Sequence, residues 1–570
     1  MEKIAHILQK HNVANKLQKR SLLIAINAVA GLSIFFFGYD QGVMGGVNTT
    51  RNYAELMGFG HWDAEAGLVK VDKSLLQGGI VAVYYLPGTL FGAWFGGWLG
   101  DKFGRINTIG IAAIWAIIGA SLQCSAQNAN WMFCARVFNG IGTGILNAIT
   151  PVWATETAAY TSRGQFVSIE FTLNIFGVVA AYWIEYGTSF YGDGTSPFIW
   201  RFPIAFQIVP LISLLCVIWF MPESPRWLVK AGREKEARWL LGRLRGEDGG
   251  DEGLAEAEFQ DIRNICELEA ETSRQQSYFS MFFGIGSGKL HTARRVQLVI
   301  WLQILQEWIG IAGITIYGPS IFTIAGITAK DRLWVSGLND ITYMFATLIC
   351  VFTLDRIGRR WTLYWGAVGQ GICCFAAGGL ARATMNASGS NKTSLGAGAT
   401  FFVFLYTAIF GATWLTVPWL YPAEIFPLQV RARGNAWGVV GWSIGNGWPV
   451  FADFEQVLLL PTIFARLNEK TLYIFGAVNA FSLLVVWAFY PETNQRTLEE
   501  MDLVFASDSI WNWEAEKNFA ILKEENPELI QAAKRGHSIV HPETGLPTSR
   551  TPSASTKTAG RRPSLTAKTQ

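Results

Sequence analysis

The sequence predicts an all-α membrane protein with twelve transmembrane helices in two pseudo-symmetric six-helix halves. Of its 570 residues, 50% are hydrophobic and only 16% are charged, whereas a typical soluble protein has about 25% charged residues. Twelve apolar stretches are each long enough to cross a bilayer. Several short motifs occur once in each half of the chain, which indicates that one six-helix unit has been used twice.

The apolar stretches set the expected order of the spans. A membrane helix needs about 20 mainly apolar residues to cross the hydrocarbon core. The spans are expected at residues 22–44, 76–99, 107–127, 131–153, 165–187, 203–221, 296–325, 334–354, 361–383, 399–421, 435–459 and 471–490.

Lysine and arginine gather in the loops on one side of these spans, and the positive-inside rule places that side and both termini in the cytosol. Three Asn-X-Ser/Thr sequons, at Asn48, Asn386 and Asn391, fall in the opposite loops. Their positions agree with this topology, because glycosylation acceptors lie in outer loops. Asn48 is so near the membrane that we do not expect it to carry a glycan.

Five parts of the chain follow from this topology. A cytosolic N-terminus (1–21) precedes the first half (22–221), a cytosolic linker of amphipathic helices (222–295), the second half (296–490) and a cytosolic tail (491–570). After Asp502 the tail becomes rich in Ser, Thr and Pro, so we expect it to be disordered. The first span is expected to be retained, because no small-residue cleavage site follows a short apolar core.

Composition also argues against several functions. The chain has 46 basic and 43 acidic residues, a net charge of +3, which gives no indication of a nucleic-acid partner. Its seven cysteines show neither disulfide nor zinc spacing. The sequence shows no nucleophile paired with a base, and it shows no cluster of metal ligands. We therefore expect neither an enzyme nor a bound metal or cofactor.

A single carboxylate interrupts the end of the first span. The run from Leu22 to Phe37 has no charge, and Asp40 follows it in the segment Phe37–Gly46. An ionised Asp inside a membrane helix costs about 3 kcal/mol, so Asp40 should face a cavity or a partner. Arg136 of the fourth span lies at a similar depth, about 8 Å below the outer surface. Alternatively, Asp40 marks the end of the helix and contacts headgroups.

The repeated motifs place charges at the cytosolic ends of the spans. Gly100-Asp-Lys-Phe-Gly-Arg105 is echoed by Leu354-Asp-Arg-Ile-Gly-Arg359. Arginine and carboxylate can pair in bidentate fashion, so these charges could close an inner mouth and separate when it opens. Alternatively, they only cap helices. The expected gate residues are Asp101, Arg105, Glu156, Arg163, Glu223, Arg226, Asp355, Arg359, Glu424, Arg433 and Glu492.

This motif set, including Pro-Glu-Ser-Pro-Arg-Trp at 222–227, resembles the sugar porter family of the major facilitator superfamily. The resemblance covers about residues 20 to 500 and is closest to fungal hexose and sugar-acid transporters. In proton-coupled members, an Asp and an Arg at the positions of Asp40 and Arg136 form the proton site. The resemblance therefore implies import of a monosaccharide by proton symport with alternating access. A uronic-acid symporter and a non-transporting sugar sensor remain alternatives, whereas Asp40 argues against a proton-independent facilitator.

The resemblance also locates a substrate site, although this sequence departs from the family there. Glu307 replaces a Gln, and Phe171 stands where a sugar-binding Gln is usual, so that simple packing is an alternative for Phe171. An ionised Glu307 near the midplane would repel a sugar acid, which favours a neutral monosaccharide. The expected substrate contacts are Gln306, Glu307, Trp419, Asn446, Phe171, Glu170 and Tyr317.

The expected partners are a sugar or sugar acid, protons and the lipid bilayer, with no nucleic acid. The resemblance implies a multi-pass protein of the plasma membrane, and we expect a monomer.

Overall fold

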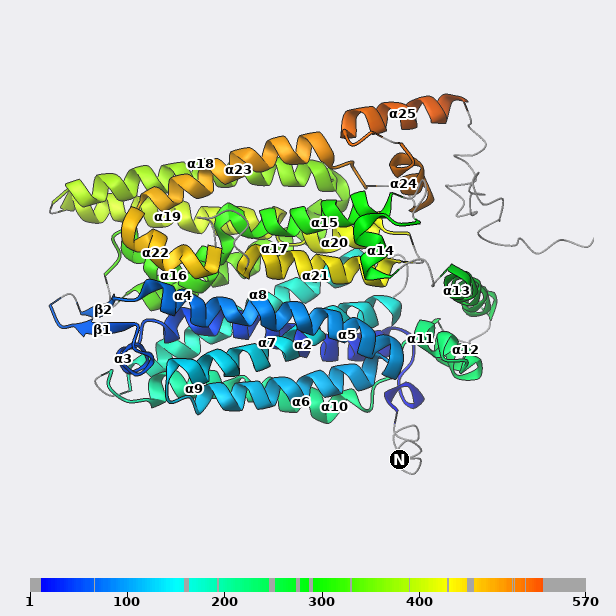
Figure 1. Cartoon of the computed structure of the whole chain (residues 1–570), viewed down its shortest axis with the longest axis horizontal. Helices are drawn as coiled ribbons and strands as arrows, with labels where there is room; N and C mark the ends of the chain where they lie inside the picture. Colours follow the sequence, from blue (N-terminus) through cyan, green and yellow to red (C-terminus); the bar gives the residue numbers. More distant parts are fainter. Residues whose placement is uncertain are drawn as a thin grey trace, which may run out of the picture.

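The helices of the two halves lie side by side and run in roughly the same direction, as the computed structural model shows (Figure 1). It describes residues 12–65, 67–157, 163–191, 194–245, 252–272, 277–286, 291–328, 331–388, 390–427, 430–447, 456–494, 496, 498–507 and 509–525. Within this part, ten of the expected spans coincide with helical segments that are long and apolar enough to cross a membrane.

The first half begins after a short 3-10 turn, η1 (Val13–Asn15). Its fifth expected span corresponds to α8. The helices of this half are α2 (Lys19–Val47), α4 (Ser74–Val83), η2 (Tyr84–Thr89), α5 (Leu90–Phe103), α6 (Arg105–Cys124), α7 (Ala129–Thr157), α8 (Arg163–Ser189), α9 (Phe198–Phe206) and α10 (Ile208–Ile218).

The second half repeats this plan. Its helices are α15 (Thr292–Gln306), η5 (Glu307–Ile311), α16 (Ala312–Ile324), α17 (Arg332–Ile357), α18 (Arg359–Asn386), α19 (Ser390–Thr413), α20 (Val417–Ile425), α21 (Arg431–Gly447), α22 (Gln456–Leu467) and α23 (Lys470–Phe489). Of the eleventh expected span, 435–459, α21 covers the residues up to Gly447 and α22 begins at Gln456, while residues 448–455 lie outside the described part.

Three spans are interrupted near their middle, where backbone groups become available. Leu86 before Pro87 has non-helical angles in η2, because proline disfavours the helical conformation of the residue before it. Gly310 in η5 has φ 116°, a conformation that glycine adopts readily. A turn at 414–416 separates α19 from α20. These interruptions let side chains at the middle of the bundle point toward one centre.

The two ends of the bundle carry different extra elements (Figure 1). At one end, the hairpin end, α3 (Arg51–Met57) precedes two antiparallel strands, β1 (Gly60–Asp63) and β2 (Leu68–Val71). These strands were not expected in an all-α chain. The opposite end, the linker end, carries α11 (Pro225–Lys230), α12 (Glu234–Arg245), α13 (Glu252–Thr272) and α14 (Tyr278–Phe283).

The tail differs from its prediction. Disorder was expected after Asp502, but α24 (Leu498–Phe505) and α25 (Asn512–Glu525) are helical and lie at the linker end. Asp502 accepts a hydrogen bond from Arg295 at 2.8 Å, and Arg496 pairs with Glu516 at 2.7 Å. These ion pairs fix both helices, and composition alone does not reveal them. Residues 526–570 lie outside the described part.

Helices α2 and α8 approach each other closely because glycines line their contact. A Cβ atom on Gly38 would lie 1.8 Å from the carbonyl oxygen of Asn174, and one on Gly177 would lie 2.2 Å from that of Phe35. Small residues allow such backbone contact between membrane helices. The contact fixes how the side chains of α8 stand relative to Asp40 on α2.

The three sequons differ in how exposed their asparagines are. Asn48 is only 4% exposed, so burial supports the expectation that it carries no glycan. Asn386 and Asn391 are exposed at the end of α18 and the start of α19, so these two side chains are accessible at the hairpin end.

Candidate functional site

A cavity lies between the two halves near the middle of the bundle. Its walls come from α2, η2 and α8 of the first half and from the seventh, eighth, tenth and eleventh spans of the second. The lining residues are Phe37, Gln41, Tyr85, Phe171, Asn174, Ile175, Gln306, Glu307, Ile311, Ala312, Thr315, Ile316, Tyr343, Phe410, Leu415, Trp419, Trp442 and Asn446. The free volume is about 40 Å³, room for about three water molecules, so a larger ligand requires the helices to move apart.

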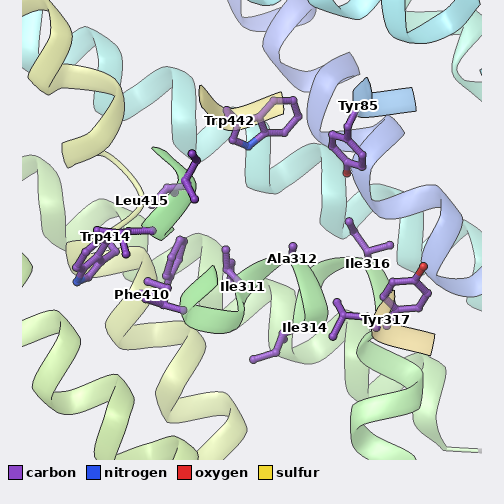
Figure 2. Packing of buried hydrophobic residues seen from close by; sticks show 14 of the residues in the cluster. Tyr85, Ile311, Ala312, Ile314, Ile316, Tyr317, Phe410, Trp414, Leu415 and Trp442 are labelled. Carbon is purple, nitrogen blue, oxygen red and sulfur yellow. The ribbon is translucent and has the colours of Figure 1, made fainter. Parts of the chain in front are cut away.

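Aromatic rings from both halves meet in this cavity. Trp442 packs against Phe37 at 5.2 Å and against Tyr85 at 5.1 Å between ring centroids, and Phe171 packs against Trp419 at 5.5 Å. Figure 2 shows Tyr85 and Trp442 on one side and Ile311, Ala312 and Ile316 on the other. Aromatic faces suit the apolar faces of a ring-shaped ligand.

The polar groups of the cavity come mainly from η5 and its neighbours. Gln306 donates from Nε2 to the carbonyl oxygens of Trp414 and Leu415, at 2.9 and 3.0 Å, whereas its Oε1 has no partner in the described structure. The carboxyl of Glu307 faces the side chains of Trp442 and Asn446. Gln306 thus supports the break between α19 and α20 with its amide nitrogen and leaves an acceptor for a ligand.

Five of the seven expected substrate contacts line the cavity: Gln306, Glu307, Trp419, Asn446 and Phe171. Glu170 does not, because its side chain leaves α8 on a different face from that of Phe171. Tyr317 packs instead against Phe464, at 6.1 Å between ring centroids. Tyr317 was expected at the site from the family resemblance, and its non-helical backbone angles within α16 change the direction in which its side chain leaves the helix.

Sequence reasoning missed Gln41, Asn174 and Thr315, and also the tyrosines Tyr85 and Tyr343, all of which line the cavity. Gln41 directly follows Asp40, and Asn174 lies one turn beyond Glu170 on α8. A polar side chain inside an apolar span was the available signal.

Asp40 and Arg136 lie together beside the cavity, between α2 and α7. Both are buried, at 0% and 1% exposure. Arg136 Nη1 lies 3.5 Å from Asp40 Oδ1, and Asn139 Nδ2 donates to Oδ2 at 2.8 Å. The guanidinium also lies over the ring of Tyr84, 4.5 Å from its centroid. Asp40 is thus held both by a guanidinium at long range and by a neutral amide at short range.

The gate residues of the first half form one network at the linker end. Arg105 donates from Nε and Nη2 to both oxygens of Glu156, at 3.0 and 3.1 Å, and lies 3.5 Å from Asp101. Glu223 accepts from the backbone N–H of Arg105 at 2.9 Å, which caps α6. Arg226 lies within electrostatic reach of Glu156. The side chain of Arg163 lies outside the described part.

The second half repeats the network almost atom for atom. Arg359 donates to Glu424 from Nη2 at 2.7 Å and lies 2.9 Å from Asp355, while Glu492 accepts from the backbone N–H of Arg359 at 2.9 Å. The turn before each arginine is a glycine with positive φ, 90° at Gly104 and 94° at Gly358. These bidentate pairs each join helices of the same half, so they brace each half and do not by themselves fasten one half to the other.

Tyr278 of α14 connects the two halves at the linker end. Its ring lies 6.2 Å from that of Trp437 on α21, and a Cβ atom on Gly97 of α5 would lie 2.6 Å from its hydroxyl. Burial and the Asp101 carboxylate raise the pKa of Tyr278 to about 12, and Arg433 opposes them. Asp101 belongs to the first half and Arg433 to the second, so Tyr278 stands between gate residues of both.

Comparison with known proteins agrees with this architecture. Residues 26–505 match the family model "Sugar (and other) transporter". The chain is 31% identical over 484 residues, 85% of each chain, to the MFS-type transporter oryC of Aspergillus oryzae. It is 28% identical to Sugar transporter STL1 of Saccharomyces cerevisiae, covering 86% of this chain and 82% of that one. It is also 28% identical to the quinate permease of Neurospora africana, and the match covers 85% of this chain and 89% of that one.

A solved structure shares the arrangement of helices. The proton:xylose symporter XylE bound to 6-bromo-6-deoxy-D-glucose superposes with a TM-score of 0.68 at 25% identity, covering 85% of this chain and 99% of the other. The predicted twelve-helix fold is therefore confirmed, and the protein is a multi-pass membrane transporter and not an enzyme. The chain belongs to the sugar transporter family of the major facilitator superfamily.

Proposed function

We propose that this transporter imports a monosaccharide together with a proton. The observation that carries the coupling is the buried contact of Asp40 with Arg136 and Asn139, beside the cavity and without solvent exposure. Burial favours the neutral form of a carboxyl group and a nearby arginine favours the ionised form. Small helix movements that change either influence can therefore load or release a proton. The proton:xylose symporter supports this reading.

The cavity supports a neutral sugar as the substrate. Its polar groups are amides, hydroxyls and the carboxyl of Glu307, set among aromatic rings. In the described part of the chain, no lysine or arginine lines it, so an anionic substrate would lack a counter-charge. A sugar acid is the second candidate, because a relative is named quinate permease and a protonated Glu307 could donate to a carboxylate.

We further propose that the protein acts as a monomer in the plasma membrane, with the linker end in the cytosol. The gate residues then lie on the cytosolic side, and a proton entering through Asp40 comes from outside. A membrane potential of 100 mV contributes about 2.3 kcal/mol per positive charge moved inward, enough for uphill uptake.

Uptake into reconstituted vesicles tests this function. We expect radiolabelled D-glucose or D-xylose to accumulate against its gradient when the vesicle interior is made alkaline, and to equilibrate without accumulation when a protonophore is present. Quinate and D-galacturonate test the sugar-acid alternative in the same vesicles. Substrate binding without any uptake would instead identify a sensor, and accumulation that the protonophore leaves unchanged would contradict proton coupling.

Replacement of Glu307 by Gln distinguishes the two substrate classes. For a neutral sugar, we expect Glu307→Gln to weaken binding about threefold to tenfold with little change in its pH profile, because one hydrogen bond contributes about 1 kcal/mol. For a sugar acid, the variant should bind at least as well at neutral pH and lose the preference for acid. Binding in detergent, without a gradient, measures this separately from coupling. No change for any ligand would show that Glu307 does not contact substrate.

A further inference from the structure

Glu170 is a buried carboxyl group that neither the cavity nor the Asp40 contact uses. It is 5% exposed, and its Oε1 has no hydrogen-bond partner among the described residues. Among the described residues, burial is the one influence found on its charge, and no charged partner is found for it. A carboxylate in such a place is costly. Glu170 is therefore expected to hold a proton in the arrangement seen here.

The position of Glu170 relates it to the cavity. Phe171 and Asn174 of α8 line the cavity, and Glu170 lies one helical turn nearer the linker end than Asn174. It is about 10 Å from the start of α8 at Arg163. Glu170 consequently stands between the cavity and the linker end.

Asp40 holds the mirrored position. It lies about 10 Å from the end of α2 at Val47, toward the hairpin end, and the adjacent Gln41 lines the cavity. Buried carboxyl groups of the first half thus stand on both sides of the same cavity, and Glu185, on the same side as Asp40, accepts from the backbone N–H groups of Gly46 and Val47. Asp40 and Glu170 are each next to, or one turn from, a polar residue that reaches the cavity.

The described residues that pack around Glu170 bring no charge to it. Asn174, Val178 and Tyr182 of α8 contact glycines of α2, and Glu170 continues this stripe toward an uncharged stretch of α2. From the second half, Thr347 bonds with Thr172 at 2.9 Å, and Trp419 contacts Phe171. The ionisable groups that line the cavity are the carboxyl of Glu307 and the hydroxyls of Tyr85 and Tyr343.

We propose that Glu170 is a second proton carrier, which takes the proton from Asp40 through cavity water and releases it at the linker end. This inference rests on the proposed proton symport. When the transporter opens toward the linker end, water reaches Glu170 and stabilises its ionised form. Its O–H bond then breaks and the proton passes to water. The carboxylate is protonated again by the proton of Asp40, which remains as a carboxylate beside Arg136.

Proton release inside vesicles tests this role. The vesicles hold a trapped pH dye. The probes are D-glucose, D-xylose and quinate, and counterflow exchange is measured in parallel. We expect Glu170→Gln to keep exchange within about twofold of the wild type but to slow substrate-driven proton release at least about tenfold, because a missing proton carrier costs rate and not binding. Glu170→Asp should restore part of the release.

A matched control is Glu469→Gln. Glu469 is also buried, at 3% exposure, but lies at the hairpin end, where Arg382 pairs with it at 2.8 Å. We expect this variant to release protons at the wild-type rate. Infrared spectra provide a readout without substrate: the carbonyl band of a protonated carboxyl group should be weaker in Glu170→Gln than in the wild type.

Wild-type proton release by Glu170→Gln would overturn the proposal, and so would equal loss of exchange and release, which would indicate a role in substrate binding. These results differ from failure of the proposed function, in which the wild type itself would show no proton-driven accumulation. An unchanged infrared band would show that Glu170 is already ionised and would also overturn the proposal.

Discussion

Asp40→Asn is expected to abolish accumulation of substrate against its gradient while leaving exchange across the membrane measurable. Asparagine keeps the shape of the side chain and can still contact Asn139 and Arg136, but it cannot bind and release a proton. A pH difference of one unit contributes about 1.4 kcal/mol per proton, which corresponds to about tenfold accumulation. The variant should lose this factor completely, whereas counterflow, which needs no net proton movement, should remain.

Two comparisons make this experiment specific. Asp40→Glu keeps the carboxyl group and should retain part of the accumulation. The control Asp72→Asn removes an exposed carboxylate near the hairpin, where His61 contacts it at 2.7 Å, and should transport like the wild type. If Asp40→Asn still concentrates substrate under an imposed proton gradient, Asp40 is not the coupling residue.

Gly38→Ala is expected to prevent stable folding, although the change adds only one methyl group. The new Cβ atom would lie 1.8 Å from the carbonyl oxygen of Asn174 and 2.6 Å from its carbonyl carbon. These are backbone atoms, so no side-chain rotation relieves the overlap and α8 must move away from α2. Overpacking costs 1–3 kcal/mol in typical cores, and we expect at least about 3 kcal/mol here.

Gly187→Ala is the matched control on α8. A Cβ atom at Gly187 would meet nothing within 4 Å, and alanine favours helix by about 1 kcal/mol over glycine. Thermal unfolding in detergent, followed by size-exclusion fluorescence, should show a lowered midpoint or little folded protein for Gly38→Ala and an equal or higher midpoint for Gly187→Ala. Wild-type stability of Gly38→Ala would show that the two helices pack less closely than the structure indicates.

The sequence by itself determined the class of protein and its internal repeat. Lipid requires long apolar helices, so hydropathy alone placed ten spans that the structure shows as suitable helices. The repeated glycine of the loop motifs has a local cause, since Gly104 and Gly358 both have positive φ directly before the next helix. Asp40 was recognisable because a charge inside an apolar run is costly wherever it points.

Only the tertiary structure decided which side chains meet. Helical register across three interrupted spans depends on Pro87, Gly310 and the turn at 414–416, so spacing alone could not show that Tyr317 leaves the cavity or that Gln41 and Asn174 enter it. The order of α25 depends on contacts outside the helix, such as the ion pair of Glu516 with Arg496. Likewise, only the packing of the helices shows that Glu170 is buried without a counter-charge while its neighbour Phe171 lines the cavity.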